Sequence, residues 1–147
     1  MKRTIKALFL ILTVGLFATS CTETARNEIA VSGTWELIKT VYQDKNTVIA
    51  EVYEIELKDV SPHYYQFSSN NDFLEITGAG SRYESISRGT WQVDEDVLLI
   101  TRQGYSERYL IDKTSLFNMS LSQDNFMYQG KSCTRILYFK SATGKVE

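Results

Sequence analysis

The sequence predicts an all-β domain built as an antiparallel meander, either an up-and-down barrel of about eight strands or a sandwich. Short segments rich in β-branched and aromatic residues follow one another at even intervals, separated by hairpin-length turns. A Gly-Thr-Trp motif opens such a segment at Gly33 and recurs at Gly89. We expect the two copies to begin the two halves of the folded region. The short connections disfavour βαβ units, which need long crossovers.

The first 20 residues have the pattern of a secretory signal peptide. Residues 1–6 are basic, residues 7–17 are apolar, and residues 18–20 are small and precede Cys21. The apolar run is too short for a stable membrane span. The cysteine in this position resembles a bacterial lipoprotein processing site, so we expect Cys21 to be lipidated and to become the first residue of the mature chain. The alternative is ordinary secretory cleavage near Cys21.

The charge balance disfavours nucleic acid as a partner. The whole chain has 16 Lys and Arg against 18 Asp and Glu, and the leader removes Lys2, Arg3 and Lys6 but no acid. The mature chain therefore carries a net charge of −5 and no basic run. Of the two cysteines, Cys133 has no intramolecular partner once Cys21 is lipidated, and we expect a buried, inert thiol.

The chain divides into three parts. Residues 1–20 are the signal peptide, residues 21–31 are the lipidated cysteine and a polar tether without periodicity, and residues 32–147 are the barrel domain. Strands are expected over 34–42, 48–57, 63–68, 72–77, 83–87, 90–93, 97–102, 105–111, 116–121, 126–128 and 134–140. Their turns include 69–71, 78–81, 94–96, 103–104, 112–114 and 122–125. Residues 48–57 also fit a helical face, but their β-branched and aromatic content favours a strand.

The region from Gly33 to Lys140 resembles the lipocalin-like lipoproteins of Gram-negative bacteria. The resemblance rests on Gly33-Thr34-Trp35, on Arg88-Gly89-Thr90-Trp91-Gln92-Val93 with the strand 97–101, and on the closing segment 134–139. It implies an eight-stranded barrel in which Trp35 seals one end and a late arginine packs across it. Arg135 is the candidate for that arginine, and Arg102 is an alternative. The tyrosine-aspartate signature of true lipocalins is absent from the sequence.

Residues for catalysis or metal binding are scarce. His63 is the only histidine, it lies beside Pro62, and neither a nucleophile elbow nor a reactive-cysteine pattern accompanies it. One histidine and one unmodified cysteine are too few for a zinc site. Residues 94–96 are acidic but lack the spacing of a calcium loop, so we interpret them as a hairpin tip. We therefore predict no enzyme, no cofactor and no metal; an enzyme that uses carboxylates alone ranks last among the functions.

Aromatic residues are the compositional feature that points to a ligand. Nine tyrosines are present, and an aromatic ring with a hydroxyl group suits a ligand cavity, although β-proteins also use tyrosine as ordinary strand filler. An eight-stranded barrel can hold one small ligand. The candidate pocket residues are Tyr65, Phe67, Tyr105 and Tyr109.

The sequence therefore predicts a membrane-anchored lipoprotein whose barrel binds a small, partly apolar ligand without covalent chemistry. The alternative is a protein-interaction module, an inhibitor or accessory subunit of the bacterial cell envelope. Thr22 stands where an inner-membrane retention aspartate would be expected, which favours the outer membrane with the domain facing the periplasm.

Overall fold

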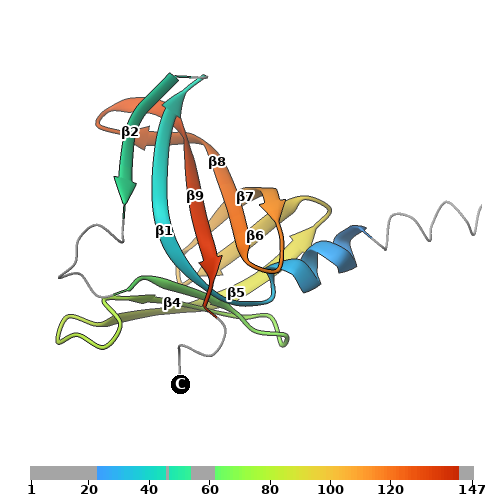
Figure 1. Ribbon diagram of the computed structural model, residues 1–147. Helices are drawn as coiled ribbons and strands as arrows, with labels where there is room; N and C mark the ends of the chain where they lie inside the picture. Colours follow the sequence, from blue (N-terminus) through green and yellow to red (C-terminus); the bar gives the residue numbers. More distant parts are fainter. Residues whose placement is uncertain (1–22, 46, 54–61, 143–147) are drawn as a thin grey trace, which may run out of the picture.

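The computed structural model describes residues 23–45, 47–53 and 62–142 (Figure 1). Within these ranges, a helix over residues 23–31 precedes nine strands. The strands are β1 (Gly33–Asp44), β2 (Thr47–Tyr53), β3 (Tyr64–Phe67), β4 (Asp72–Thr77), β5 (Ser85–Asp94), β6 (Val97–Arg102), β7 (Tyr105–Thr114), β8 (Asn118–Tyr128) and β9 (Lys131–Ser141). In the described part of the chain, the helix is neither long nor apolar enough to cross a membrane.

The strands form a closed antiparallel barrel. Each of β3 to β9 pairs with its neighbour in sequence, and β1 closes the barrel by pairing with both β3 and β9. Strand β2 is a ninth, additional strand, because it pairs with the second half of β1 beyond the segment that contacts β3. The prediction of an all-β, up-and-down barrel of about eight strands is confirmed. The predicted segment 48–57 is a strand as far as Tyr53, and its remainder lies outside the described residues.

The two ends of the barrel differ. The helix and the turns β3–β4, β5–β6 and β7–β8 lie at one end, whereas the other end carries the remaining hairpin turns (Figure 1). At the helix end the interior is filled by a continuous apolar core that includes Phe73, Leu98, Leu121 and Phe139. Val31, the last helical residue, is fully buried in this core, so the helix covers the end of the barrel. We call this end the closed end and the opposite one the open end.

The helix corrects one expectation. Residues 22–31 read as a tether without periodicity, but residues 23–31 are helical. Val31 is buried, and the side chain of Asn27 donates a hydrogen bond to the carbonyl oxygen of Glu95 in the β5–β6 turn. The physical reason is that the barrel leaves apolar core side chains uncovered at this end. A polar segment can pack there when a single apolar side chain, Val31, enters the core.

Two expected turns are wrong. Residues 112–114 continue β7, and the turn lies at residues 115–117, where the Ser115 hydroxyl accepts a hydrogen bond from the Asn118 amide. Residues 122–125 lie within β8, where the polar residues form a bulge rather than a turn. Asn125 takes a positive φ of 58° in this bulge. Asparagine tolerates that conformation better than most residues, so the same composition suits both a turn and a bulge.

The two Gly-Thr-Trp motifs have different roles. Gly33 begins β1, as expected, but Gly89 lies inside β5, so the second motif does not begin a strand. Gly89 is required there because a Cβ atom would collide with the carbonyl oxygen of Thr101 on β6. Both tryptophans are buried in the same apolar core.

Candidate ligand-binding site in the open half of the barrel

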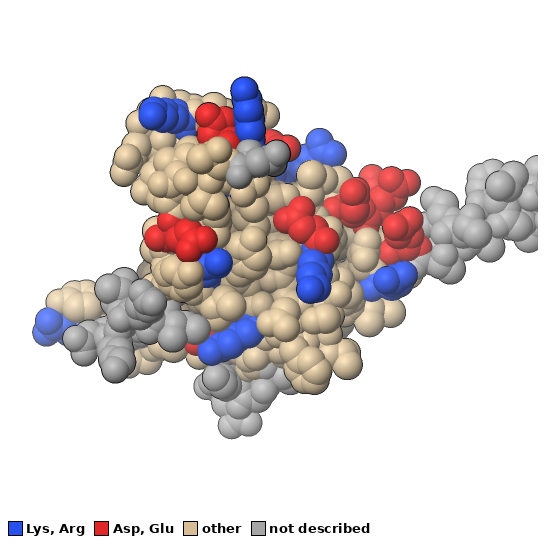
Figure 2. Space-filling view, turned by 45° about the horizontal axis from the view of Figure 1, so that its top comes forward, with Lys and Arg blue, Asp and Glu red and all other residues tan. Residues whose placement is uncertain are grey.

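Charged side chains lie on the inner surface of the barrel, towards its open end. Successive side chains of a strand point to opposite faces, so every second residue shares a face. Four charged residues are in phase with neighbouring core residues: Glu75 with Phe73, Arg102 with Ile100, Glu107 with Tyr109, and Arg135 with Leu137. On the outer face drawn in Figure 2, acidic and basic side chains are interspersed. The unusual feature is therefore the charged interior.

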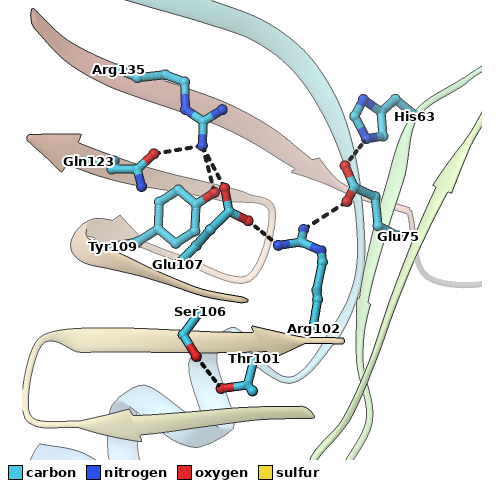
Figure 3. A network of polar contacts seen from close by, with 9 residues as sticks. All are labelled: His63, Glu75, Thr101, Arg102, Ser106, Glu107, Tyr109, Gln123 and Arg135. Carbon is cyan, nitrogen blue, oxygen red and sulfur yellow. Dashed lines mark hydrogen bonds and ion pairs between the residues drawn. The ribbon is translucent and has the colours of Figure 1, made fainter. Parts of the chain in front are cut away.

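These residues form one chain of contacts across the barrel (Figure 3). His63 Nε2 lies 2.8 Å from one carboxylate oxygen of Glu75, and Arg102 Nη2 donates to the other at 2.7 Å. Arg102 Nη1 donates to Glu107, which also accepts from Arg135 Nη2 at 3.2 Å. The chain thus links residues from β4, β6, β7 and β9. Two arginines and two glutamates balance in charge, which is how a barrel interior can hold four charges.

Burial and pairing together set the pKa values in this network. Burial alone would raise the pKa of the Glu75 carboxyl, but the hydrogen bond with His63 and the charge of Arg102 outweigh burial and lower it to about 2. Burial disfavours the charge of Arg102, but Glu107 and Glu75 outweigh this and raise its pKa. Burial raises the pKa of the Tyr109 hydroxyl. Glu75 and Arg102 are therefore ionised and Tyr109 is neutral at neutral pH.

Arg135 has an uneven set of hydrogen bonds. Its Nη2 donates to Tyr109 Oη at 2.8 Å and to Gln123 Oε1 at 2.7 Å, in addition to Glu107. Three acceptors therefore share one nitrogen, which carries only two hydrogens. The Nε–H of Arg135 is buried and has no partner in the described part of the chain, and the same is true of Arg102 Nε. Buried donors are rarely left unpaired, because each one loses its hydrogen bonds to water.

An aromatic wall stands beside Arg135. Tyr42 lies opposite Arg135 on β1, so both side chains face the interior. The ring of Tyr42 stacks on Tyr128 at a centroid distance of 4.0 Å and lies 5.7 Å from Phe126. The guanidinium of Arg135 lies 4.3 Å from the centroid of Phe126. The open half of the barrel therefore offers an apolar surface directly next to a polar network.

A hollow separates β7 from β8 at the open end. The two strands pair only from Leu110 and Ser122 towards the closed end, so β7 before Leu110 and β8 after Ser122 diverge. The resulting hollow has a volume of about 560 Å³, within the range of small-molecule sites. Its lining includes Tyr109 and Gln123, two of the acceptors on Arg135, and Arg108 at its exposed side.

Trp35 and Arg135 do not form the predicted closing contact. Trp35 lies opposite Ser141 on β9, whereas Arg135 lies opposite Tyr42, towards the other end of β1. Trp35 is buried at the closed end, and its Nε1 donates to the carbonyl oxygen of Val31 at 2.8 Å. Arg102, the alternative partner, packs over Phe73 instead. The helix covers Trp35 in place of an arginine.

The four candidate pocket residues occupy different environments. Tyr65 and Phe67 are core residues that contact each other and Phe73. Tyr105 is exposed at the start of β7. Tyr109 is the one that lines the hollow between β7 and β8. A ligand-binding role for any of them stays a prediction. Cys21 lies outside the described residues.

Five residues of this region were not predicted from the sequence: Tyr42, Glu75, Glu107, Gln123 and Phe126. A signal for the two glutamates was present, because Phe73-Leu74-Glu75 and Glu107-Arg108-Tyr109 place a charge in phase with an apolar core residue. Only strand pairing and barrel closure, however, bring the side chains of β4 and β7 together in the interior. In the described part of the chain, no group of three or more His, Cys, Asp or Glu side chains has the arrangement of a metal site.

Comparison with known proteins defines the family. The family model of the lipocalin-like domain matches residues 31–128, which is more than half of the chain. The chain belongs to the lipocalin-like domain family. This domain is typically a binding, non-enzymatic module with a barrel that generally takes small hydrophobic ligands.

A solved structure supports the assignment of the fold. The lipocalin-like chain is similar to the crystal structure of an uncharacterized protein from Bacteroides eggerthii DSM 20697, with 15% sequence identity and a TM-score of 0.51. The match covers 75% of this chain and 98% of the other. At this identity the likeness concerns the fold alone. No protein with curated annotation matches the chain.

Proposed function

We propose that this lipocalin-like domain binds a small, partly apolar ligand non-covalently in the open half of its barrel, and that Cys21 anchors it by a lipid to the bacterial cell envelope. The supporting observation is the adjacency of the aromatic wall (Tyr42, Phe126 and Tyr128) to the buried network around Arg135. A ligand with one apolar and one polar part would satisfy both surfaces at once.

The closed half supports the same location. Its interior is filled by tightly packed core side chains, so a ligand would bind nearer the open end. The hollow between β7 and β8 would provide space beside the network. A lipid at Cys21 would hold the closed end of the barrel nearest to the bilayer, because the helix that covers this end begins at residue 23. We place the anchor in the outer membrane, with the domain facing the periplasm.

The test is native mass spectrometry of the chain purified gently from its own host. We expect a stoichiometric small-molecule adduct that disappears on denaturation, and its mass would begin to identify the ligand. Phe126→Ala should reduce the adduct. The matched control is Met127→Ala, because Met127 is the next residue of β8 and is exposed on the outer face. A bare mass for the wild type, or equal loss of adduct in both variants, would contradict the proposal.

Strand β2 favours a second candidate function, a protein-interaction module. It pairs with β1 on one side, and within the described residues no strand covers its other edge. Four of its residues are exposed and apolar or aromatic: Val48, Ile49, Val52 and Tyr53. Such an edge can accept a strand of another protein. A photo-crosslinking residue at position 48 should then capture an envelope protein that the same residue at exposed Thr90 on β5 does not capture.

A further inference from the structure

We propose that the polar end of the ligand is a carboxylate-type oxyanion that accepts a hydrogen bond from Nε of Arg135. The inference rests on the proposed function, since it assumes that a ligand enters the open half of the barrel, and it specifies the chemical class of that ligand. Its basis is the buried Nε–H of Arg135, which lacks an acceptor in the part of the chain that the structure describes, and a hollow large enough for a small molecule that is lined by two partners of Arg135, Tyr109 and Gln123.

The hydrogen bonds of Arg135 show what is missing. All three of its side-chain acceptors, Glu107, Tyr109 and Gln123, bind the same nitrogen, Nη2. Among the described residues the buried Nε–H has no acceptor, whereas Nη2 has more acceptors than hydrogens. An incoming oxygen acceptor would satisfy the Nε–H. A carboxylate is the acceptor whose two oxygens match the planar donor edge of a guanidinium.

The surroundings of Arg135 favour an anion with an apolar part. Phe126 packs on the guanidinium face at 4.3 Å, so the face is covered and an acceptor would approach the edge. Tyr109 and Gln123 line the hollow between β7 and β8, so this hollow reaches the partners of Arg135. Arg108 and Asp124 both line this hollow, so its own charges balance and the attraction for an anion comes from Arg135.

Glu107 would compete with the ligand for the guanidinium of Arg135. Its carboxylate accepts from both Arg102 and Arg135 and so supplies the charge that a ligand carboxylate would also supply. Replacing it with neutral glutamine would leave the two arginines with less compensating charge. The proposal therefore predicts opposite effects for two neighbouring residues: loss of oxyanion binding in Arg135→Gln and tighter binding in Glu107→Gln. A role limited to structural support would not produce opposite effects on affinity.

The test uses three probes that share one alkyl chain: octanoate, octanol and octylamine. Each is titrated calorimetrically into the full chain from its host after the co-purified ligand has been removed, with the detergent alone as the blank. We expect octanoate to bind at least about tenfold more tightly than the other two, a difference of about 1.4 kcal/mol. Arg135→Gln should abolish this preference and leave octanol binding unchanged. Glu107→Gln should strengthen octanoate binding only.

The matched control is Arg88→Gln, which removes the same charge from an exposed position on β5. It should keep the preference for octanoate. If octanoate and octanol bind equally, or if Arg88→Gln weakens octanoate as much as Arg135→Gln does, the oxyanion site is wrong while ligand binding by the barrel stands. If none of the three probes binds, the oxyanion site is again wrong, and the adduct experiment decides the proposed function separately. Should Arg135→Gln fail to fold, the Glu107→Gln titration carries the test alone.

Discussion

The indole Nε1 of Trp35 donates a hydrogen bond of 2.8 Å to the carbonyl oxygen of Val31. Trp35 is the third residue of β1, and Val31 is the last residue of the helix, so this bond joins the helix to the barrel wall. Val31 is fully buried and Trp35 is 4% exposed. The closed end of the barrel is thus sealed by a local pair of residues rather than by an arginine from β9.

Trp35→Ala should lower the free energy of unfolding by about 3–5 kcal/mol, because it removes a large side chain from a filled core. Trp35→Phe should cost about 1–3 kcal/mol, since it leaves the Val31 carbonyl without its donor. Urea unfolding followed by circular dichroism measures both. The control is Tyr83→Ala at a residue that is 73% exposed, and it should change stability little. A loss under about 1 kcal/mol for Trp35→Ala would mean that this end of the barrel is not sealed as described.

Gly89→Ala should destabilise the barrel by about 1–3 kcal/mol, the usual cost of forcing extra atoms into a packed site. The added Cβ would meet the carbonyl oxygen of Thr101, which belongs to the backbone of β6 and can move only with its strand. Thermal unfolding of Gly89→Ala beside Thr90→Ala tests this, because Thr90 is the next residue and is exposed. Equal melting temperatures for the two variants would show that β5 and β6 are not so close at Gly89.

Glu75 should make the protein sensitive to acid. Its pKa is lowered from an ordinary value of 4.5 to about 2 by His63 and Arg102, which outweigh burial. A carboxyl group with a lowered pKa in the folded state stabilises that state above pH 4.5, and the stabilisation is lost as the pH falls towards 2. Its size is on the order of 3 kcal/mol.

The corresponding measurement is the free energy of unfolding of the wild type and of Glu75→Gln between pH 7 and pH 2. The variant should be less stable at neutral pH, and the difference should shrink as the pH falls. Glu84→Gln, at an exposed residue of the β4–β5 turn, is the control and should lower the stability at neutral pH much less than Glu75→Gln does. A Glu75→Gln curve parallel to that of the wild type would refute the assigned role of the carboxylate.

Cys21→Ser should release the protein into the soluble fraction of the cell envelope, because a thiol is needed for the lipid. Fractionation followed by immunoblotting measures the distribution. Cys133→Ser serves as the control, since Cys133 is buried in the barrel and cannot carry an anchor. Membrane association of Cys21→Ser equal to that of the wild type would count against the lipid anchor.

Local sequence pattern was sufficient for the elements of the barrel and insufficient for its irregularities. Alternation of apolar and polar residues marks β4, β6 and β7 because one face of each strand is buried against the core. The bulge in β8 was not predicted, because a bulge and a turn use the same polar residues. The position of Gly89 inside β5 was not predicted either, because it depends on the close approach of Thr101 on β6. Pairing with the neighbouring strand decides whether a polar segment forms a bulge or a turn.

Sequence alone determined that this chain forms an antiparallel β-meander, because strand periodicity and short turns act over a few residues, and the resemblance to lipocalin-like lipoproteins implied that the meander closes into a barrel. The sequence also predicted a ligand-binding role from tyrosines, of which Tyr65 and Tyr109 are buried in the core and Tyr105 is exposed. The tertiary structure alone decided that Glu75, Arg102, Glu107 and Arg135, which lie on four different strands, meet inside the barrel. The physical reason is that register and closure set which distant side chains share the interior, and neither is written in any local segment.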